Sequence, residues 1–135
     1  MIVDAGPLYA TYDADDAVHG ACRRLLETFR GPLLVPILVV TEVAYLLATR
    51  IGTETEVRFL GDLAAGNLIP EQVAASDWLR MAELVGRYHD LPLDTVDASI
   101  VATAERLGTR AIATLDHRHF SVVRPAHTSN FELLP

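Results

Sequence analysis

Short apolar segments alternate along this chain with longer segments of helical periodicity, and this alternation constrains the fold most strongly. The expected strands are Met1–Val3, Leu33–Val35, Leu68–Val73, Arg110–Thr114 and Ser121–Arg124. Short apolar strands between helices are typical of an α/β fold, a parallel sheet covered by helices on both faces. Pro70 favours an edge position for the third strand. Because all the strands are short, an all-helical bundle is the structural alternative.

Capping and breaking residues set the limits of the expected helices. Gly6-Pro7 predicts a turn after the first strand. A helix capped by Asp15 or Asp16 runs to about Phe29, and another begins at Pro36 and runs to Arg50. The remaining expected helices are Thr53–Ala65, opened by a capping box with Glu56; Ser76–Tyr88; and Asp94–Leu107, capped by Asp94 and closed by Gly108.

Length and composition exclude several classes of protein. The chain has 135 residues, so we expect a single domain over residues 1–135. One cysteine, Cys22, provides neither a disulfide framework nor a cysteine metal cage. The eleven basic residues are all Arg, which excludes chemistry that needs a Lys amine, such as P-loop phosphate binding or Schiff-base formation.

The net charge of −7 argues against a protein that simply coats nucleic acid, because such proteins carry a basic face. This net charge remains compatible with an enzyme that binds nucleic acid through bound cations. The longest weakly charged stretch, Gly31–Thr49, contains Pro36 and Glu42, which makes a membrane span improbable. The N-terminus lacks the pattern of a signal peptide. We therefore expect a soluble cytoplasmic protein.

Three separate segments bring aspartates to one edge of the expected sheet. Asp4 follows the first strand, Asp116 lies just beyond the fourth, and Asp97 lies near the start of a helix. Ligands of parallel α/β sheets bind at the carboxyl ends of the strands. Each aspartate alone also has a structural interpretation, and Asp94 is interpreted as a plain helix cap. Asp97 shares a stripe with Ile100 and is expected to point inward.

Glu42 is the most informative acidic residue. It is the only charged side chain between Arg30 and Arg50, in a helix that is apolar almost all round and therefore expected to be buried. A lone buried carboxylate is costly unless it is paired or binds a cation. The alternatives are a salt bridge to an arginine, a position on a wet strip of the helix, or a metal site.

Carboxylates crowded together repel one another, and a hard divalent cation removes that penalty. Oxygen ligands without Cys or paired His favour Mg²⁺ or Mn²⁺ over Zn²⁺. Such sites activate water and stabilise charge on phosphodiesters, as in metal-dependent nucleases. No nucleophile elbow or dinucleotide fingerprint is present.

Other polar and aromatic residues carry weaker signals. His117 and His119 could bind metal or phosphate, but a solvated loop is the favoured interpretation. Arg118 could contact RNA phosphate, although surface charge is favoured. Thr114 could hydrogen-bond a ligand or simply end a strand. The aromatic residues Trp78, Tyr45 and Tyr88 are expected in the core rather than as platforms for base stacking.

These motifs together resemble the PIN-domain family, and in particular the VapC-type toxins of bacterial toxin–antitoxin pairs. The segments that carry the resemblance are Ile2–Leu8, Val40–Val43, Leu93–Ala104, Thr114–Asp116 with Phe120 and Val123–Pro125, and Phe131–Pro135. Many members have Thr or Ser after the first Asp. Here Ala5 follows Asp4, so a supporting hydrogen bond is either lost or supplied by Thr114.

The resemblance implies a three-layer α/β/α sandwich with a small parallel sheet of four or five strands. It also implies a Mg²⁺-dependent endoribonuclease, with Mn²⁺ as a substitute ion. Asp4, Asp97 and Asp116 would hold the metal, and Glu42 would complete the catalytic cluster. The RNA would be transfer or ribosomal RNA.

A homodimer and a cognate VapB-type antitoxin are implied as well. The antitoxin would lay a segment in an apolar groove and direct an Arg into the acidic site. Two alternatives stay open at this point. One is a PIN-fold binding module with weak or lost nuclease activity, and the other is a nuclease that acts in RNA processing or on DNA.

Overall fold

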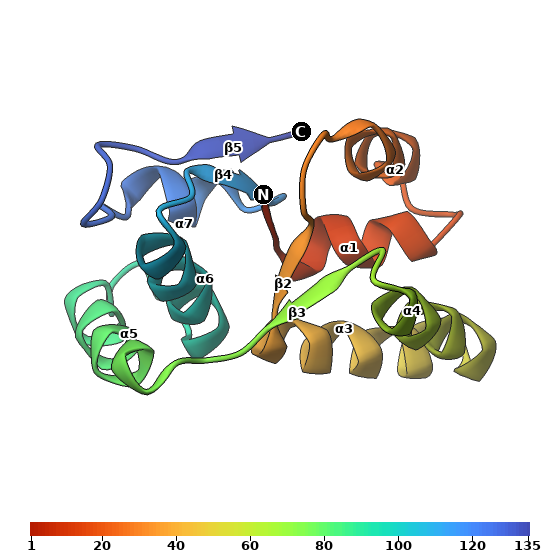
Figure 1. The fold of residues 1–135 in the computed structure, drawn as a ribbon, viewed down its shortest axis with the longest axis horizontal. Coiled ribbons are helices and arrows are strands. Elements are labelled where there is room, and N and C mark those ends of the chain that lie inside the picture. Colours follow the sequence, from red (N-terminus) through yellow and green to blue (C-terminus); the bar gives the residue numbers. More distant parts are fainter.

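The computed structural model describes residues 1–135, and its fold is shown in Figure 1. The strands are β1 (Ile2–Val3), β2 (Leu34–Pro36), β3 (Ile69–Glu71), β4 (Ala111–Ala113) and β5 (Glu132–Leu134). The helices are α1 (Ala5–Tyr12), α2 (His19–Thr28), α3 (Ile37–Arg50), α4 (Thr53–Ala65), α5 (Ala75–Arg87), α6 (Thr95–Leu107) and α7 (His117–Val122). No helix combines the length and the apolar character that crossing a membrane requires.

The strands form one parallel sheet of five strands in the order β3-β2-β1-β4-β5. Helices α1 to α4 lie on one side of the strands in Figure 1, and α5 and α6 lie on the other. This is the predicted three-layer α/β/α sandwich, and the all-helical alternative is wrong. β3 lies at an edge, as Pro70 predicts. β1 is central, which places the end of its strand, at Asp4, in the middle of the sheet.

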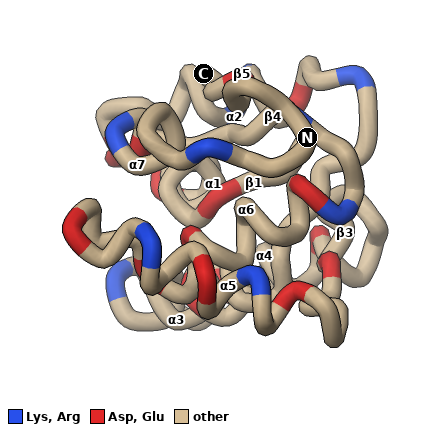
Figure 2. The backbone as a smooth tube through the Cα atoms, turned by 90° about the vertical axis from the view of Figure 1, so that its left-hand side faces the viewer, with Lys and Arg blue, Asp and Glu red and all other residues tan.

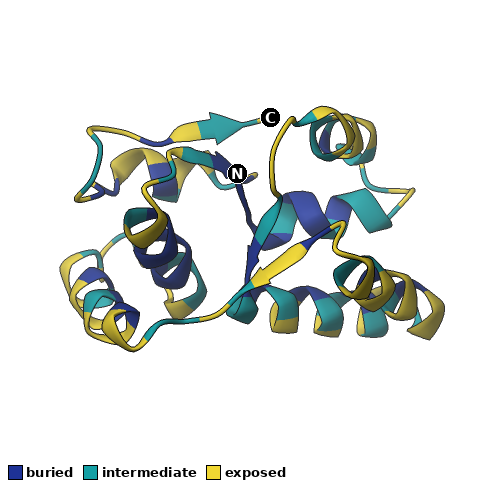
Figure 3. Cartoon of the chain, in the orientation of Figure 1, coloured by how far each residue is buried: buried dark blue, intermediate teal, exposed yellow.

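The core lies between the sheet and the helices that cover it. Ile2, Val35 and Ile112 in the sheet, together with Val43 of α3 and Ile100 of α6, have no exposed surface. Figure 3 shows the buried residues gathered on the inner sides of the helices and along β1 and β4. Central strands that are apolar on both faces are expected in a sheet covered by helices on both sides.

The turn predicted at Gly6-Pro7 is wrong, because these residues lie in the first turn of α1. Asp4 is the N-cap, and its Oδ1 accepts a hydrogen bond of 2.6 Å from the backbone N of Ala5. Proline is tolerated in a first helical turn, where its missing N–H has no partner to lose. α1 therefore begins directly after β1.

The fifth strand predicted at Ser121–Arg124 is also wrong. Residues His117–Val122 form the short helix α7, and the fifth strand is Glu132–Leu134, paired with β4. Phe120 and Val123 are almost completely buried. The apolar residues of this segment pack one helical face onto the core.

Some helix ends follow the predictions and others do not. Asp94 caps α6 by accepting from the backbone N of Asp97 at 2.8 Å, and Gly108 closes it at a φ of 64°. The capping box of Thr53 is not formed, because Gly52 is the N-cap of α4. α2 begins only at His19 because Asp16 instead accepts from the backbone N of Val18.

Ion pairs hold the two helices of the α5–α6 layer together. Arg80 of α5 donates two hydrogen bonds of 2.8 Å to Glu105 of α6. Arg106 of α6 contacts Asp77 of α5 at 3.1 Å and Glu71 of β3 at 3.0 Å. These contacts fix the orientation of α6, which carries Asp97 at its other end.

Candidate active site

One cavity of about 570 Å³ is lined by all four acidic residues expected in the site: Asp4, Glu42, Asp97 and Asp116. They come from four different elements. Asp4 follows β1, Glu42 is on α3, Asp97 is in the first turn of α6, and Asp116 is the N-cap of α7. The parallel sheet brings these elements together at the carboxyl ends of β1 and β4. Their roles in catalysis and in metal binding remain predictions.

Asp4 is the most deeply buried of the four carboxylates, with 9% of its surface exposed. Its Oδ2 accepts a hydrogen bond of 2.7 Å from the hydroxyl of Thr114, at the end of β4. The same hydroxyl accepts from the backbone N of Asp116 at 3.0 Å. Thr114 therefore supplies the supporting hydrogen bond that Ala5 cannot make, and it links the first acidic residue to the last.

Asp97 and Asp116 both contact His119, in the middle of α7. The Nδ1 atom of His119 lies 3.1 Å from Oδ2 of Asp97 and 3.0 Å from Oδ2 of Asp116. The backbone N of His119 also donates to Oδ1 of Asp116 at 3.0 Å. Asp97 points inward as predicted, with 16% of its side chain exposed. The expectation of a solvated loop at His119 is wrong.

Glu42 is exposed, so the expectation of a buried residue is wrong. Only Val39, Val43 and Leu47 of α3 are buried, and Glu42 lies off that face, on the lining of the cavity. It forms no salt bridge with an arginine, so that alternative is wrong. Its exposure fits a position on a wet strip of the helix, and its role at a metal site stays a prediction. α3 is apolar beyond its buried face, which is why its sequence overstates its burial.

Asp94 adds a fifth carboxylate to the lining of this cavity. Its role as an N-cap is confirmed, since Oδ1 accepts from the backbone N of Asp97. Its charge also raises the pKa values of Asp4, Glu42 and Asp97. The interpretation as a plain helix cap is therefore too narrow.

Burial and crowding disfavour the charged forms of Asp4, Asp97 and Glu42. Burial raises the pKa of Asp4, with a further increase from Asp116 and Asp94, although hydrogen bonds from Thr114 and Ala5 oppose the shift. Burial, Asp94 and Asp4 raise the pKa of Asp97 to about 6, against the opposing effect of His119. A cation in the cavity would offset this repulsion.

Partial burial, followed by the charges of Asp4 and Asp94, also raises the pKa of Glu42. The repulsion thus extends across the cavity from β1 to α3 and α6. Local basic charge does little to offset it, because Arg118 is the only arginine on the lining and it forms no ion pair. The electrostatics of the cavity favour a cationic ligand.

The chemistry of these side chains fits Mg²⁺ or Mn²⁺, which bind carboxylate oxygens. No three His, Cys, Asp or Glu side chains are grouped closely enough to hold one ion directly. Mg²⁺ usually takes only one or two carboxylates from a protein and keeps several waters. Asp4, Asp97 and Asp116 therefore fit such an ion with part of their contacts made through water.

Comparison with known proteins identifies the family of this chain. The model of the PIN domain family matches residues 1–124. The chain belongs to the PIN domain family. This PIN domain is also 36% identical to Ribonuclease VapC26 of Mycobacterium tuberculosis over 135 residues, which cover 100% of both chains. The resemblance to VapC-type toxins is thereby confirmed, and homology to a ribonuclease indicates a nuclease.

Solved structures show the same PIN fold. VapC20 of Mycobacterium tuberculosis, described as a toxin that cleaves the sarcin–ricin loop, superposes with a TM-score of 0.77 at 24% identity. The match covers 82% of this chain and 85% of VapC20. FitAcB from Neisseria gonorrhoeae superposes with a TM-score of 0.60 at 12% identity, covering 99% of this chain and 96% of the other. These likenesses support the fold alone.

The structure places at the site three residues that the sequence analysis treated as weaker candidates. His117 and Arg118 line the cavity, and His119 joins two of its carboxylates. Their position directly after Asp116 was the available signal, but it had been assigned to a loop. Trp78 and Tyr45 are 53% and 68% exposed, so their expected place in the core is wrong.

Proposed function

We propose that this PIN domain is a Mg²⁺- or Mn²⁺-dependent endoribonuclease and the toxin of a toxin–antitoxin pair. One observation carries the proposal. Carboxylates from four elements line one cavity, where burial and mutual repulsion raise the pKa values of three of them. Homology to a VapC ribonuclease supports RNA as the substrate class.

The proposed roles follow from the position of each residue. Asp4, Asp97 and Asp116 would hold the cation. When bound, the cation would lower the pKa of a coordinated water and offset charge that develops on the phosphodiester. The carboxylate of Glu42, exposed on the cavity lining, would accept a hydrogen bond from the attacking water and orient it. Arg118 would contact an RNA phosphate through its unpaired guanidinium.

Cleavage of purified RNA tests the activity. The wild-type protein should cut total RNA when Mg²⁺ or Mn²⁺ is present and stop when EDTA is added. Asp97→Asn keeps the size of the side chain but removes its charge, and it should lower the rate at least about 100-fold. Equal cleavage by both proteins would mean that a contaminating nuclease is responsible.

Ribosomal RNA, and within it the sarcin–ricin loop, is the first substrate to test among the transfer and ribosomal RNAs. The similar fold of VapC20, a toxin described as cleaving that loop, motivates this choice. Primer extension on RNA from cells that express the chain should show a single new end in the loop. A new end in a transfer RNA would assign the other substrate.

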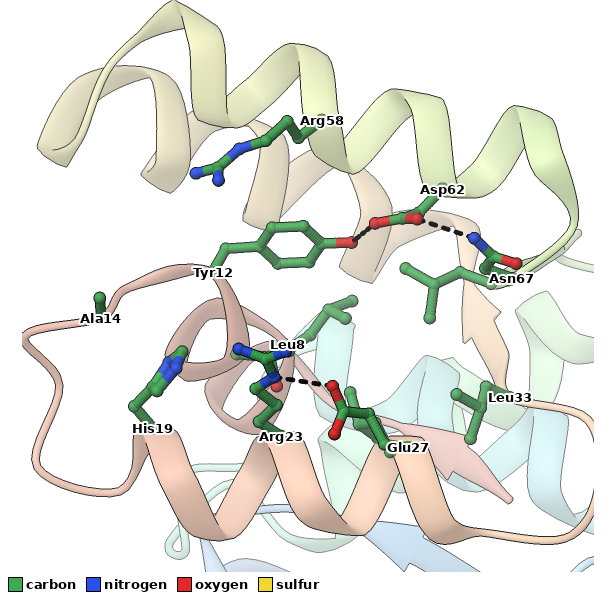
Figure 4. Close-up of a pocket in the computed structure, with 13 residues that line it drawn as sticks. Leu8, Tyr12, Ala14, His19, Arg23, Glu27, Leu33, Arg58, Asp62 and Asn67 are labelled. Carbon is green, nitrogen blue, oxygen red and sulfur yellow. Dashed lines mark hydrogen bonds and ion pairs between the residues drawn. The ribbon is translucent and has the colours of Figure 1, made fainter.

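The proposed antitoxin would be a VapB-type protein encoded beside this chain. Its arginine would enter the acidic cavity and compete with the cation. A second cavity, of about 670 Å³, lies between α1, α2 and α4 and would receive an antitoxin segment (Figure 4). Leu8, Leu26 and Leu33 supply apolar contacts there, and Arg58 and Asp62 supply charge.

A homodimer is also proposed. Trp78 and Leu79 of α5 are 53% and 70% exposed and offer apolar surface to a second copy. Sedimentation velocity should report twice the mass of one chain, and Trp78→Glu should restore the monomer. A monomeric wild-type protein would reject this part of the proposal.

The second candidate function is a PIN-fold binding module that has little or no nuclease activity. The spacing of the carboxylates favours it, since no three of them are close enough to hold an ion directly. Titration with Mn²⁺ separates the two candidates, because a module predicts neither binding nor a rise in melting temperature. Cleavage of DNA but not RNA would instead favour the alternative nuclease roles.

A further inference from the structure

His119 lies between two of the proposed metal ligands, although the proposed function gives it no role. Its Nδ1 atom is 3.1 Å from Oδ2 of Asp97 and 3.0 Å from Oδ2 of Asp116. Asp97 belongs to α6 and Asp116 caps α7, so one ring nitrogen bridges two elements. Its side chain is only 17% exposed.

The packing of α7 fixes where this imidazole lies. Phe120 and Val123 are each 1% exposed and anchor the helix on the core. The ring of Phe120 makes an edge-on contact with that of Phe131, with centroids 6.3 Å apart. The backbone N of His119 is also bound to Oδ1 of Asp116. His119 is therefore held at both its backbone and its side chain.

The chemistry of the contact assigns the direction of donation. Ionised carboxylates only accept hydrogen bonds, so Nδ1 carries the proton. It donates a hydrogen bond to Oδ2 of Asp97 and lies within ion-pair distance of Oδ2 of Asp116. This N–H lies where the two negative groups would otherwise repel each other. Groups beside metal ligands commonly orient them in this way.

We propose that His119 is a positioning residue whose Nδ1–H holds Asp97 and Asp116 at the spacing needed to share a divalent cation. The inference rests on the proposed metal site, and it adds His119 as a residue that orients two of the metal ligands. Nδ1 cannot bind the ion while it carries its proton, so ligation by His119 would have to use Nε2, and the proposal assigns no such ligation. The role of His119 is to order the ligands before the cation arrives.

Three substitutions test this role by calorimetric titration of the purified chain with MnCl₂. His119→Asn places an amide N–H close to the position of Nδ1 and should keep Mn²⁺ affinity within about threefold. His119→Gln and His119→Ala remove that donor and should weaken Mn²⁺ binding about tenfold or more, as loss of supporting groups does at other metal sites. The control, His89→Asn, changes an exposed histidine paired with Asp90 and should bind like the wild type.

Pulsed EPR of the Mn²⁺-loaded protein distinguishes positioning from direct ligation. The proposal predicts no nitrogen directly coordinated to Mn²⁺, whereas ligation by His119 would give a ¹⁴N coupling that disappears in His119→Gln. If His119→Gln bound Mn²⁺ as tightly as the wild type, the role of His119 would be overturned and the proposed metal site would stand. Absence of Mn²⁺ binding by the wild type would overturn the metal site and the inference together. Circular dichroism identifies the folded variants, and if His119→Ala does not fold, His119→Gln decides the test.

Discussion

Thr114 links the carboxylate of Asp4 to the backbone of Asp116. Its hydroxyl donates to Asp4 and accepts from the backbone of Asp116, and its own surface is completely buried. A buried group that loses such a partner is left unsatisfied, which costs more than the bond itself contributes. From the sequence alone, the hydrogen bond that supports Asp4 was either lost or supplied by Thr114.

Thr114→Val keeps the shape of the side chain but removes both hydrogen bonds. We expect the free energy of unfolding to fall by about 1.5–3 kcal/mol, because one of the lost bonds is made to a charged group. Urea denaturation at pH 7 measures it. Thr114→Ser keeps the hydroxyl and serves as the control. A valine variant as stable as the wild type would show that the hydroxyl contributes nothing to Asp4.

Asp97 makes the stability of the metal-free protein depend on pH. Its pKa rises from 3.8 to about 6 on folding, so the folded state binds this proton more tightly than the unfolded state. The stabilisation is therefore fully present below about pH 4 and is lost as the pH rises through 6. The shift corresponds to at most about 3 kcal/mol, which solvent access reduces to about 1–2 kcal/mol.

Asp97→Asn removes this titration. In EDTA at pH 7.5 the variant should be about 1–2 kcal/mol more stable than the wild type, and the difference should vanish near pH 4. Thermal unfolding at several pH values measures it. Asp90→Asn, at a side chain 95% exposed, should have no effect at either pH. A variant that is less stable than the wild type at pH 7.5 would give the Asp97 carboxylate a stabilising role.

At the scale of elements, α6 brings Asp97 to the cavity because ion pairs hold its other end. Arg106 contacts Asp77, which is only 4% exposed, together with Glu71 of β3 and the carbonyl of Gln72. A buried carboxylate that loses its partner is strongly destabilising. The orientation of this helix therefore depends on a contact far along the chain from the cavity.

Arg106→Ala should lower the free energy of unfolding by about 2–3 kcal/mol, because Asp77 keeps its charge but loses its guanidinium partner. Chemical denaturation measures the loss. Arg23→Ala breaks an exposed pair with Glu27 and should cost much less stability than Arg106→Ala. If the two variants lost equal stability, the burial of Asp77 would not matter energetically.

The elements that the sequence predicts well are those with local signals at both ends. α6 has Asp94 before it and Gly108 after it, and β3 carries Pro70 at the sheet edge. α7 was missed, and its last two residues were predicted as part of a strand at Ser121–Arg124, because its apolar residues are few and its helical face is defined only by packing on the core. α1 was missed because Gly6-Pro7 is typical of a turn between elements. In the structure these two residues lie in the first turn of the helix, where proline is tolerated.

The site also contains residues that the local sequence predicts and residues whose place depends on tertiary packing. Four acidic residues could be selected because each follows a strand, interrupts an apolar helix or shares the inward stripe of a helix. His119 was named only as a weaker candidate, since its contact with Asp97 spans 22 residues and depends on how α7 docks. Glu42 was expected to be buried because the sequence of α3 does not show which apolar face the core covers.

At the scale of the whole molecule, the net charge of −7 is combined with a cavity lined by five carboxylates. Acidic and basic segments are interspersed on the side of the chain shown in Figure 2, without a uniformly basic face. RNA binding would therefore rely on cations in the cavity and on a few arginines such as Arg118. The same acidity would attract the arginine of an antitoxin.

A crystal of the protein soaked in MnCl₂ and measured at the manganese edge tests the account most directly. We predict an anomalous peak inside the cavity, within ligand or water-bridged distance of Asp4, Asp97 and Asp116 and on the side facing Glu42. Asp97→Asn crystals soaked in the same way should show a much weaker peak. Manganese bound only elsewhere, or absent from the wild-type cavity at saturating concentration, would contradict the central claim.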